Sequence, residues 1–100
     1  MSALQTRAKN AVLRVADTFT VSGNARKGWI RICSYGRALL YATPAEVDTY
    51  SRPLRILLIP HDDPTSVGDT VVWNSLSLSV KKSADVRFRD ETVAKVLLLA

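Results

Sequence analysis

The sequence predicts a small, mainly β fold with a minor α part: an antiparallel β-barrel or β-sandwich with an N-terminal helix. From Val67 to Ala100, apolar and polar residues alternate in short runs, which places one row of side chains on each face of a strand. Residues that favour turns separate these runs. Before residue 17, apolar residues instead recur at three- and four-residue steps, which is typical of a helix. The 100 residues are expected to form a single domain, with the barrel at about 18–99.

The first expected element is a helix from about Ser2 to Ala16. Ser2 and Gln5 have the spacing of a capping box, in which each satisfies a backbone N–H of the other. The apolar stripe consists of Leu4, Ala8, Ala11, Val12 and Val15. Because Ala and Val dominate this stripe, the helix should pack closely on a sheet or another helix. Binding of a partner is the alternative role.

Strands and turns should alternate through the next part of the chain. Thr18–Val21 and Lys27–Ser34 read as strands joined by a turn at Ser22–Ala25. Tyr35–Arg37 then predicts another turn, and Ala38–Ala42 a further short strand. In the second of these strands, Ile30 and Ile32 should share the buried face.

A second capping box is expected in the middle of the chain, where Thr43 precedes Glu46 by three residues. Thr43–Ser51 is therefore either a short helix or an irregular loop. Leu54–Ile59 is almost continuously apolar, which predicts a strand buried on both faces. His61–Ser66 is polar and contains proline, so an exposed, mobile loop is expected there.

The last third predicts four short strands, at Thr70–Trp73, Leu76–Lys82, Val86–Phe88 and Val93–Leu99. Ser83–Asp85 and Arg89–Thr92 should form two of the turns between them. The residues expected in the core are Leu4, Val12, Val15, Ile30, Ile32, Ile56, Leu58, Val80, Val86, Phe88, Val96 and Leu98.

No residue combination predicts catalysis, so we expect no enzyme and no cofactor. Cys33 and His61 are single residues of their types, which excludes an internal disulfide and leaves too few soft ligands for a zinc site. The serines lack a nucleophile-elbow motif, and no glycine-rich phosphate loop is present. The longest apolar run, Ile56–Ile59, is far shorter than the ~20 residues of a membrane span. Without a visible signal peptide, synthesis in a reducing cytoplasm is expected.

Charge is distributed unevenly along the chain, whose formal net charge is +5. Residues 1–55 contain nine basic and three acidic residues, whereas residues 56–100 contain five basic and six acidic residues. Such a polarity indicates a nucleic-acid face, or a basic side that meets an acidic partner, unless it is only a solvated surface. A stacking platform for bases is disfavoured because Phe88 should face away from Arg87 and Arg89.

The second half of the chain resembles a known class of proteins in its order of motifs. A strand ending at Pro60 is followed by Gly-Asp-x-Val-x-Trp from Gly68, Leu-x-Leu-x-Val from Leu76, and Val-x-Lys-Val-Leu-Leu-Leu from Val93. This layout, over about Leu54–Ala100, resembles the head–tail joining proteins of long-tailed bacteriophages, which are head-completion (stopper) and minor capsid proteins.

The resemblance implies a virion structural protein of the head–tail connector, made in the host cytoplasm. It would form a homo-oligomeric ring between the portal or adaptor and the tail terminator or tail tube, and help to retain or gate DNA. The alternatives are a small-barrel nucleic-acid-binding protein and, third, a cytosolic toxin–antitoxin or regulatory module. The predicted protein-interaction residues are Arg26, Lys27, Arg37, His61, Asp62, Asp63 and Thr65. The predicted DNA-facing residues are Lys81, Lys82, Arg87 and Arg89, and contact with packaged DNA would be non-specific.

Overall fold

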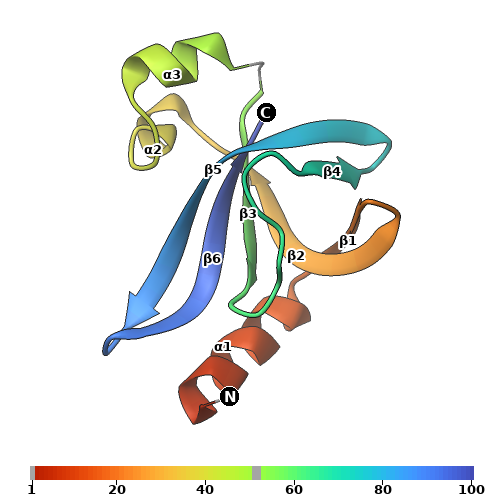
Figure 1. Ribbon diagram of the computed structural model, residues 1–100, viewed down its shortest axis with the longest axis vertical. Coiled ribbons are helices and arrows are strands. Elements are labelled where there is room, and N and C mark those ends of the chain that lie inside the picture. The colour runs from red at the N-terminus through yellow and green to blue at the C-terminus, as the bar shows by residue number, and fades with distance from the viewer. Residues whose placement is uncertain (1, 51–52) are drawn as a thin grey trace.

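A computed structural model describes residues 2–50 and 53–100, so Ser51 at the end of the predicted Thr43–Ser51 segment, and Arg52 of the basic half, lie outside it. The described residues form a closed antiparallel barrel with strand order β1-β2-β3-β6-β5-β4, preceded by a helix (Figure 1). The predicted fold class is confirmed. The elements are α1 (Ala3–Arg14), β1 (Asp17–Val21), β2 (Asn24–Ile32), α2 (Tyr35–Ala38), α3 (Pro44–Thr49), β3 (Arg55–Pro60), β4 (Thr70–Trp73), β5 (Leu76–Phe88) and β6 (Glu91–Leu99).

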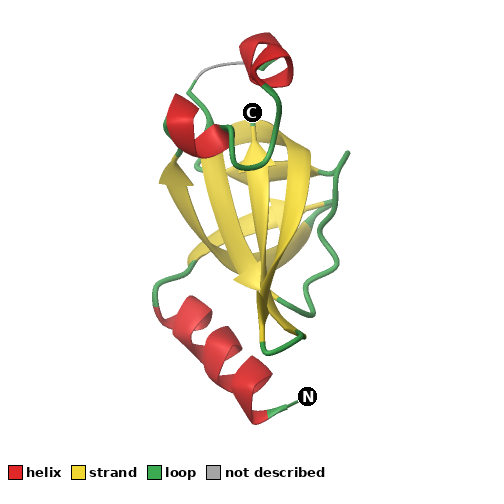
Figure 2. Cartoon of the chain, turned by 90° about the vertical axis from the view of Figure 1, so that its left-hand side faces the viewer, coloured by secondary structure: helices red, strands yellow, loops and turns green. Residues whose placement is uncertain are grey.

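Helix α1 begins at the predicted capping box. The Ser2 hydroxyl accepts a hydrogen bond from the Gln5 backbone N–H, and the Gln5 side chain accepts one from the Ser2 N–H, both at 3.1 Å. Gln5 Nε2 also donates to the Thr92 carbonyl of β6 at 3.0 Å, and Val12 is buried against the barrel. Val15, predicted to be core, is instead exposed, because it is the C-cap residue where the helix has already ended. Figure 2 shows α1 at one end of the barrel and the two short helices at the other.

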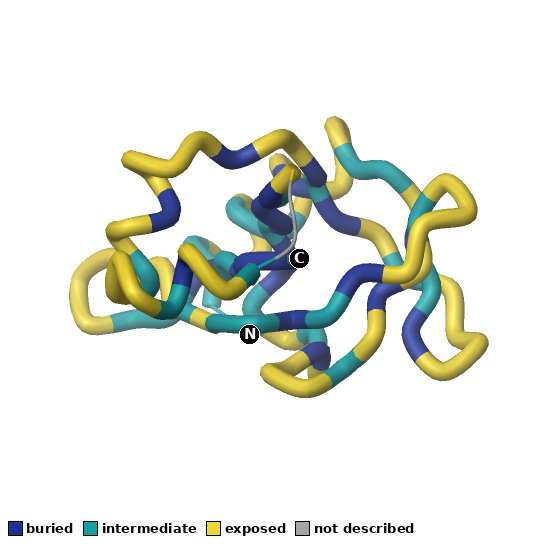
Figure 3. Tube along the Cα trace, turned by 90° about the horizontal axis from the view of Figure 1, so that it is seen from above, coloured by how far each residue is buried: buried dark blue, intermediate teal, exposed yellow. Residues whose placement is uncertain are grey.

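The barrel interior is filled by aliphatic side chains and one phenyl ring. The buried cluster consists of Phe19, Val21, Ile30, Leu57, Ile59, Val71, Leu78, Val80, Leu97 and Leu99, with Trp73 packed against it. These residues come from all of the described strands, so the cluster holds the sheet closed on itself. The trace in Figure 3 accordingly shows buried segments toward the centre and exposed segments at the outer turns.

Gly28 is the point at which β2 changes partners. Up to Gly28 the strand pairs with β1, and from Trp29 it pairs with β3. A Cβ atom at Gly28 would lie 2.6 Å from the Leu57 side chain and 2.9 Å from the Leu58 carbonyl oxygen. Glycine is therefore required here by close approach of β3, as is common where a barrel strand bends.

A second buried cluster lies under α2 and α3, and consists of Cys33, Ala38, Val47, Leu54, Ile56 and Leu98. The predicted turn at Tyr35–Arg37 and the strand at Ala38–Ala42 are wrong. Ser34 caps a short helix through a 3.2 Å hydrogen bond from the Arg37 N–H, and this helix turns Ala38 into the cluster. Of the two alternatives for the next segment, the helix is observed: Thr43 and Glu46 form the predicted capping box of α3.

Strand β5 is one 13-residue strand, so the predicted turn at Ser83–Asp85 is wrong. Its partner β6 continues alongside as far as the Phe88–Glu91 pair, and pairing resumes after shifts of register between Val80 and Lys82 and between Val86 and Arg87. Pairing with β6 satisfies the backbone hydrogen-bonding groups of Ser83–Asp85. This pairing outweighs the local preference of these residues for a turn. The two strands form an arm that extends past the barrel (Figure 1).

This arm explains two of the remaining errors in the predicted core. Val86 and Phe88 are exposed because they lie on the arm, beyond the strands that could cover them, and Ile32 is exposed at the end of β2. Leu4, Leu58 and Val96 are half-buried rather than core residues. The predicted core positions Val12, Ile30, Ile56, Val80 and Leu98 are buried as expected.

Candidate interaction surfaces

The loop after β3 is tied to the barrel by a compact polar network. The Thr65 N–H and hydroxyl both donate to Asp63 Oδ1, at 2.9 and 2.6 Å. Arg26 on β2 donates to the Thr65 hydroxyl at 2.6 Å, and its guanidinium lies 3.5 Å from Asp63 Oδ1. Lys95 of β6 donates to the Asp63 carbonyl at 2.9 Å. Thr65 is buried, so the expectation of an exposed loop is wrong at this residue, because the loop supplies the partners of two cations.

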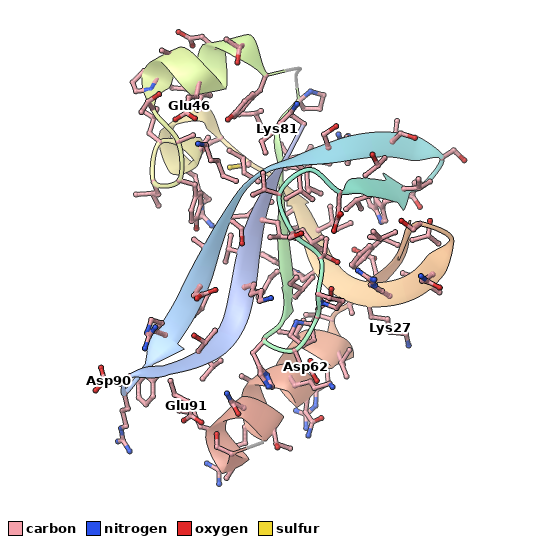
Figure 4. All side chains as sticks on the ribbon, in the orientation of Figure 1. Lys27, Glu46, Asp62, Lys81, Asp90 and Glu91 are labelled. Atoms are coloured by element: carbon pink, nitrogen blue, oxygen red, sulfur yellow. The ribbon has the colours of Figure 1, made fainter. Side chains whose placement is uncertain are left out.

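This network changes the role of three predicted interaction residues. Arg26, Asp63 and Thr65 satisfy one another and are half-buried or buried, so their side chains are engaged within the fold. Removing one of them would leave the others partly unsatisfied. Lys27, the next residue on β2, is exposed, and Figure 4 shows its side chain pointing away from the barrel.

Asp62 lies on the side of the loop that faces α1. Lys9 donates to Asp62 Oδ2 at 2.8 Å, and this hydrogen bond lowers the pKa of the Asp62 carboxyl. His61 Nδ1 is buried without a hydrogen-bond partner among the described residues. The contact between Lys9 and Asp62 thus joins the helix to the loop, and no local spacing in the sequence indicates this pair.

Lys81 and Lys82 contact α3 and its C-cap instead of forming a free basic patch. Lys82 forms an ion pair with Glu46, and this hydrogen bond is the main reason that the pKa of the Glu46 carboxyl falls to about 2. Lys81 Nζ lies 5.7 Å from the centroid of the Tyr50 ring, within cation–π distance. The predicted DNA-facing lysines therefore connect β5 to the helical end of the barrel.

Arg37 and Cys33 belong to the same end of the molecule. Arg37 is exposed on α2. Burial raises the pKa of the Cys33 thiol, and the positive charge of Arg37 opposes this shift. Since a raised pKa keeps the group as a thiol, Cys33 lacks the thiolate character of a reactive cysteine.

The tip of the arm brings Arg89 against the Phe88 ring, contrary to the predicted separation of these two residues. Arg89 lies in a turn with φ of 53°, and Asp90 follows with φ of 64°, so neither continues the alternation of β5. The turn folds the Arg89 guanidinium over the exposed Phe88 ring, 5.2 Å from its centroid. Arg87 donates to the Asp90 carbonyl at 3.0 Å. The tip is therefore an exposed basic and aromatic surface. Its turn has positive φ at Arg89 and Asp90, and this residue pair does not indicate such a turn in the sequence.

The predicted functional residues thus fall into separate groups. Lys27 lies on β2, Lys81 and Lys82 lie at the helical end, and Arg87 and Arg89 lie at the tip of the arm. Figure 4 shows Lys81 and Asp90 at opposite ends of the β5–β6 pair. No single basic face joins these groups.

An apolar surface that sequence reasoning missed lies at the helical end. Ile32 and Leu40 are 73% and 75% exposed, and Tyr35 and Leu39, which are close to them in sequence, are also exposed. We call these four residues the α2 patch. The sequence predicted Ile32 in the core and the other three residues in a turn or a strand. Their shared exposure depends on the helix α2, which the sequence did not predict. An exposed group of large apolar residues is typical of a protein-binding surface.

Among residues 2–50 and 53–100, no three His, Cys, Asp or Glu side chains lie close enough to hold a metal ion. No helix in that part of the chain is long and apolar enough to cross a membrane. No protein-family model, curated protein or solved structure matches the chain.

Proposed function

We propose that this protein is a structural component of a phage head–tail connector, which assembles as a ring between portal and tail and helps to retain or gate DNA. The main support is that several large apolar side chains are exposed and belong to neither of the two buried clusters. Leu40 of the α2 patch and Phe88 of the arm are exposed while the barrel cluster and the helical cluster are both closed. These side chains are available for assembly.

The positions of the two surfaces suit a ring. A ring requires a head-to-tail contact, in which one patch of a subunit meets a different patch of its neighbour. The α2 patch and the arm tip lie at opposite ends of the molecule (Figure 1). The resemblance over Leu54–Ala100 suggests the portal or adaptor and the tail terminator or tail tube as the other partners, with the virion as the final location.

The decisive experiment is complementation of a phage that lacks this gene, with a melting curve for each variant. Leu40→Glu should fold normally, because the side chain is 75% exposed, yet should leave heads that leak DNA or cannot accept tails. Ser77→Glu is the matched control, since it places the same charge at an exposed site of β5 outside the α2 patch. Normal infectious particles from stably folded Leu40→Glu would remove the α2 patch from the assembly surface. Absence of the protein from purified particles would refute the function itself.

Lys27→Glu tests the basic half of the chain in the same assay. Lys27 is exposed, so its reversal should leave the melting curve unchanged and reduce assembly if this site meets a partner. Arg26 should not be substituted together with Lys27, because a glutamate at this position would face Asp63 in the loop network and destabilise the fold. Normal particles from Lys27→Glu would exclude this site as an assembly contact.

One observation favours nucleic-acid binding as a second function. Arg87, the exposed Phe88 ring and Arg89 at the arm tip combine the cation and stacking groups that single strands require. Binding of an oligonucleotide should then weaken steeply with salt, and Phe88→Ala should reduce it. Affinity that is unchanged by this substitution would argue against the tip as the binding site.

A further inference from the structure

Half of strand β5 has an open backbone edge. β5 pairs with β4 only from Leu76 to Ser79, and with β6 from Val80 onward. Within the described residues, no strand pairs with the other edge of β5 beyond Lys82. Figure 1 shows this part of β5 at the margin of the molecule, with no element beyond it. The outward N–H and C=O groups of an edge strand can pair with another strand.

The side chains along this edge carry charges of both signs. Asp85 and Arg87 are exposed and lie two residues apart, so they project from the same face of β5. Lys95, directly across from Asp85 on β6, donates to the Asp63 carbonyl in the loop network. No described ion pair includes Asp85. The Asp85 carboxylate is thus available to a cation outside the chain.

We propose that the open edge binds the same edge of a second copy of this chain, antiparallel and centred on Val86. In this register Asp85 of each copy faces Arg87 of the other, and Ala84 faces Phe88. The sheet would continue from β6 and β5 of one copy into β5 and β6 of the second.

The charge pattern selects a second copy as the occupant. Two identical antiparallel strands centred on Val86 bring opposite charges together twice, and such directly opposed pairs stabilise a sheet. Centring the pair one residue earlier would instead place Asp85 against Asp85, which is unfavourable. Protected edges usually carry proline or charges that repel a copy. β5 contains no proline, and its exposed charges are self-complementary about Val86.

This contact differs in symmetry from the proposed ring contact, although both surfaces include Phe88. It joins the same patch on two subunits and therefore closes after two, whereas a ring needs two different patches. It involves only Ala84–Phe88 of each copy, so it should be weaker than contacts of standard size, which bury ~1,200–2,000 Å². We expect a dimer that forms as the concentration rises.

Charge exchange tests the pairing, read by sedimentation equilibrium over a wide concentration range. Asp85→Arg and Arg87→Asp each create two like-charge pairs and should weaken the dimer at least about tenfold. The double variant D85R/R87D restores opposite charges and should recover the wild-type dissociation constant within about threefold. A wild-type chain that stays monomeric at about 1 mM, or a double variant as weak as the singles, would overturn the proposal.

Cysteine cross-linking tests the register. In the proposed pair the two Val86 Cα atoms are about 4.5–5.5 Å apart, which a disulfide can span. Val86→Cys should therefore yield a disulfide-linked dimer on mild oxidation. Phe88→Cys is the control, since the two Phe88 residues would be four residues apart along the strands, or about 13 Å. Cys33 is present in both variants and is buried. Equal cross-linking of both variants, or of neither, would contradict the register centred on Val86.

Discussion

Gly28→Ala should destabilise the barrel strongly, although it only replaces one hydrogen atom by a methyl group. The added methyl carbon would lie 2.9 Å from the Leu58 carbonyl oxygen, closer than real Cβ atoms are found. It would also lie 2.6 Å from Leu57 Cδ1 and 2.9 Å from Ile59 Cγ2, and both of these side chains are completely buried. Neither β3 nor its side chains can yield without disturbing the barrel core. Overpacking of this kind costs ~1–3 kcal/mol and sometimes more.

Thermal unfolding followed by circular dichroism measures this cost, since ~1 kcal/mol shifts the melting temperature by about 4–8 °C in a domain of this size. Gly36→Ala is the matched control. Gly36 lies in α2, and no atom lies within 4 Å of the position that its Cβ would occupy. Alanine should be neutral or slightly stabilising there, because it favours the helix. A Gly28→Ala protein that melts like the wild type would refute the requirement for glycine at the bend of β2.

Three further predictions concern stability. Leu57→Ala should destabilise the protein by ~2–5 kcal/mol in urea unfolding, because Leu57 is completely buried in the barrel. Lys82 lowers the Glu46 pKa from 4.5 to about 2 in the folded chain, so the contribution of this pair to stability is fully present only above a pH of about 4.5. Stability should therefore fall as the pH drops from about 4.5 towards about 2. The double variant Arg89→Asn with Asp90→Gly should raise the melting temperature, because both residues have positive φ and Asn-Gly favours this turn. The backbone strain relieved should be ~1 kcal/mol or more.

Each of these predictions has a control. Leu58→Ala should cost less than Leu57→Ala because Leu58 is half-buried, and the reverse order would contradict the packing of β3. Glu46→Gln should flatten the pH dependence between about 4.5 and 2, and an unchanged slope would mean that other carboxylates dominate it. A lower melting temperature for the double turn variant would show that the Arg89 contact with Phe88 outweighs the backbone strain.

Local features of this chain could be predicted where the deciding interactions span a few residues. Both capping boxes, at Ser2 and at Thr43, join residues three apart, so residue types alone indicate them. β-Branched and aromatic residues likewise indicated β4, and alternation from Leu76 to Val80 indicated the first part of β5, because the two faces of a strand are visible in sequence. Together with chain length, these signals were sufficient for the fold class.

Tertiary structure decided what depends on distant partners. Ser83–Asp85 has turn propensity, but it is strand because β6 supplies a ladder beyond the barrel. Phe88 and Val86 alternate as core residues do, yet they are exposed because the arm extends past every strand that could cover them. The Arg26 side chain bonds within the fold rather than facing a partner, because a loop 37 or more residues later supplies Asp63 and Thr65. The sequence records side-chain period and turn preference, whereas burial and charge pairing depend on which segments the closed barrel brings together.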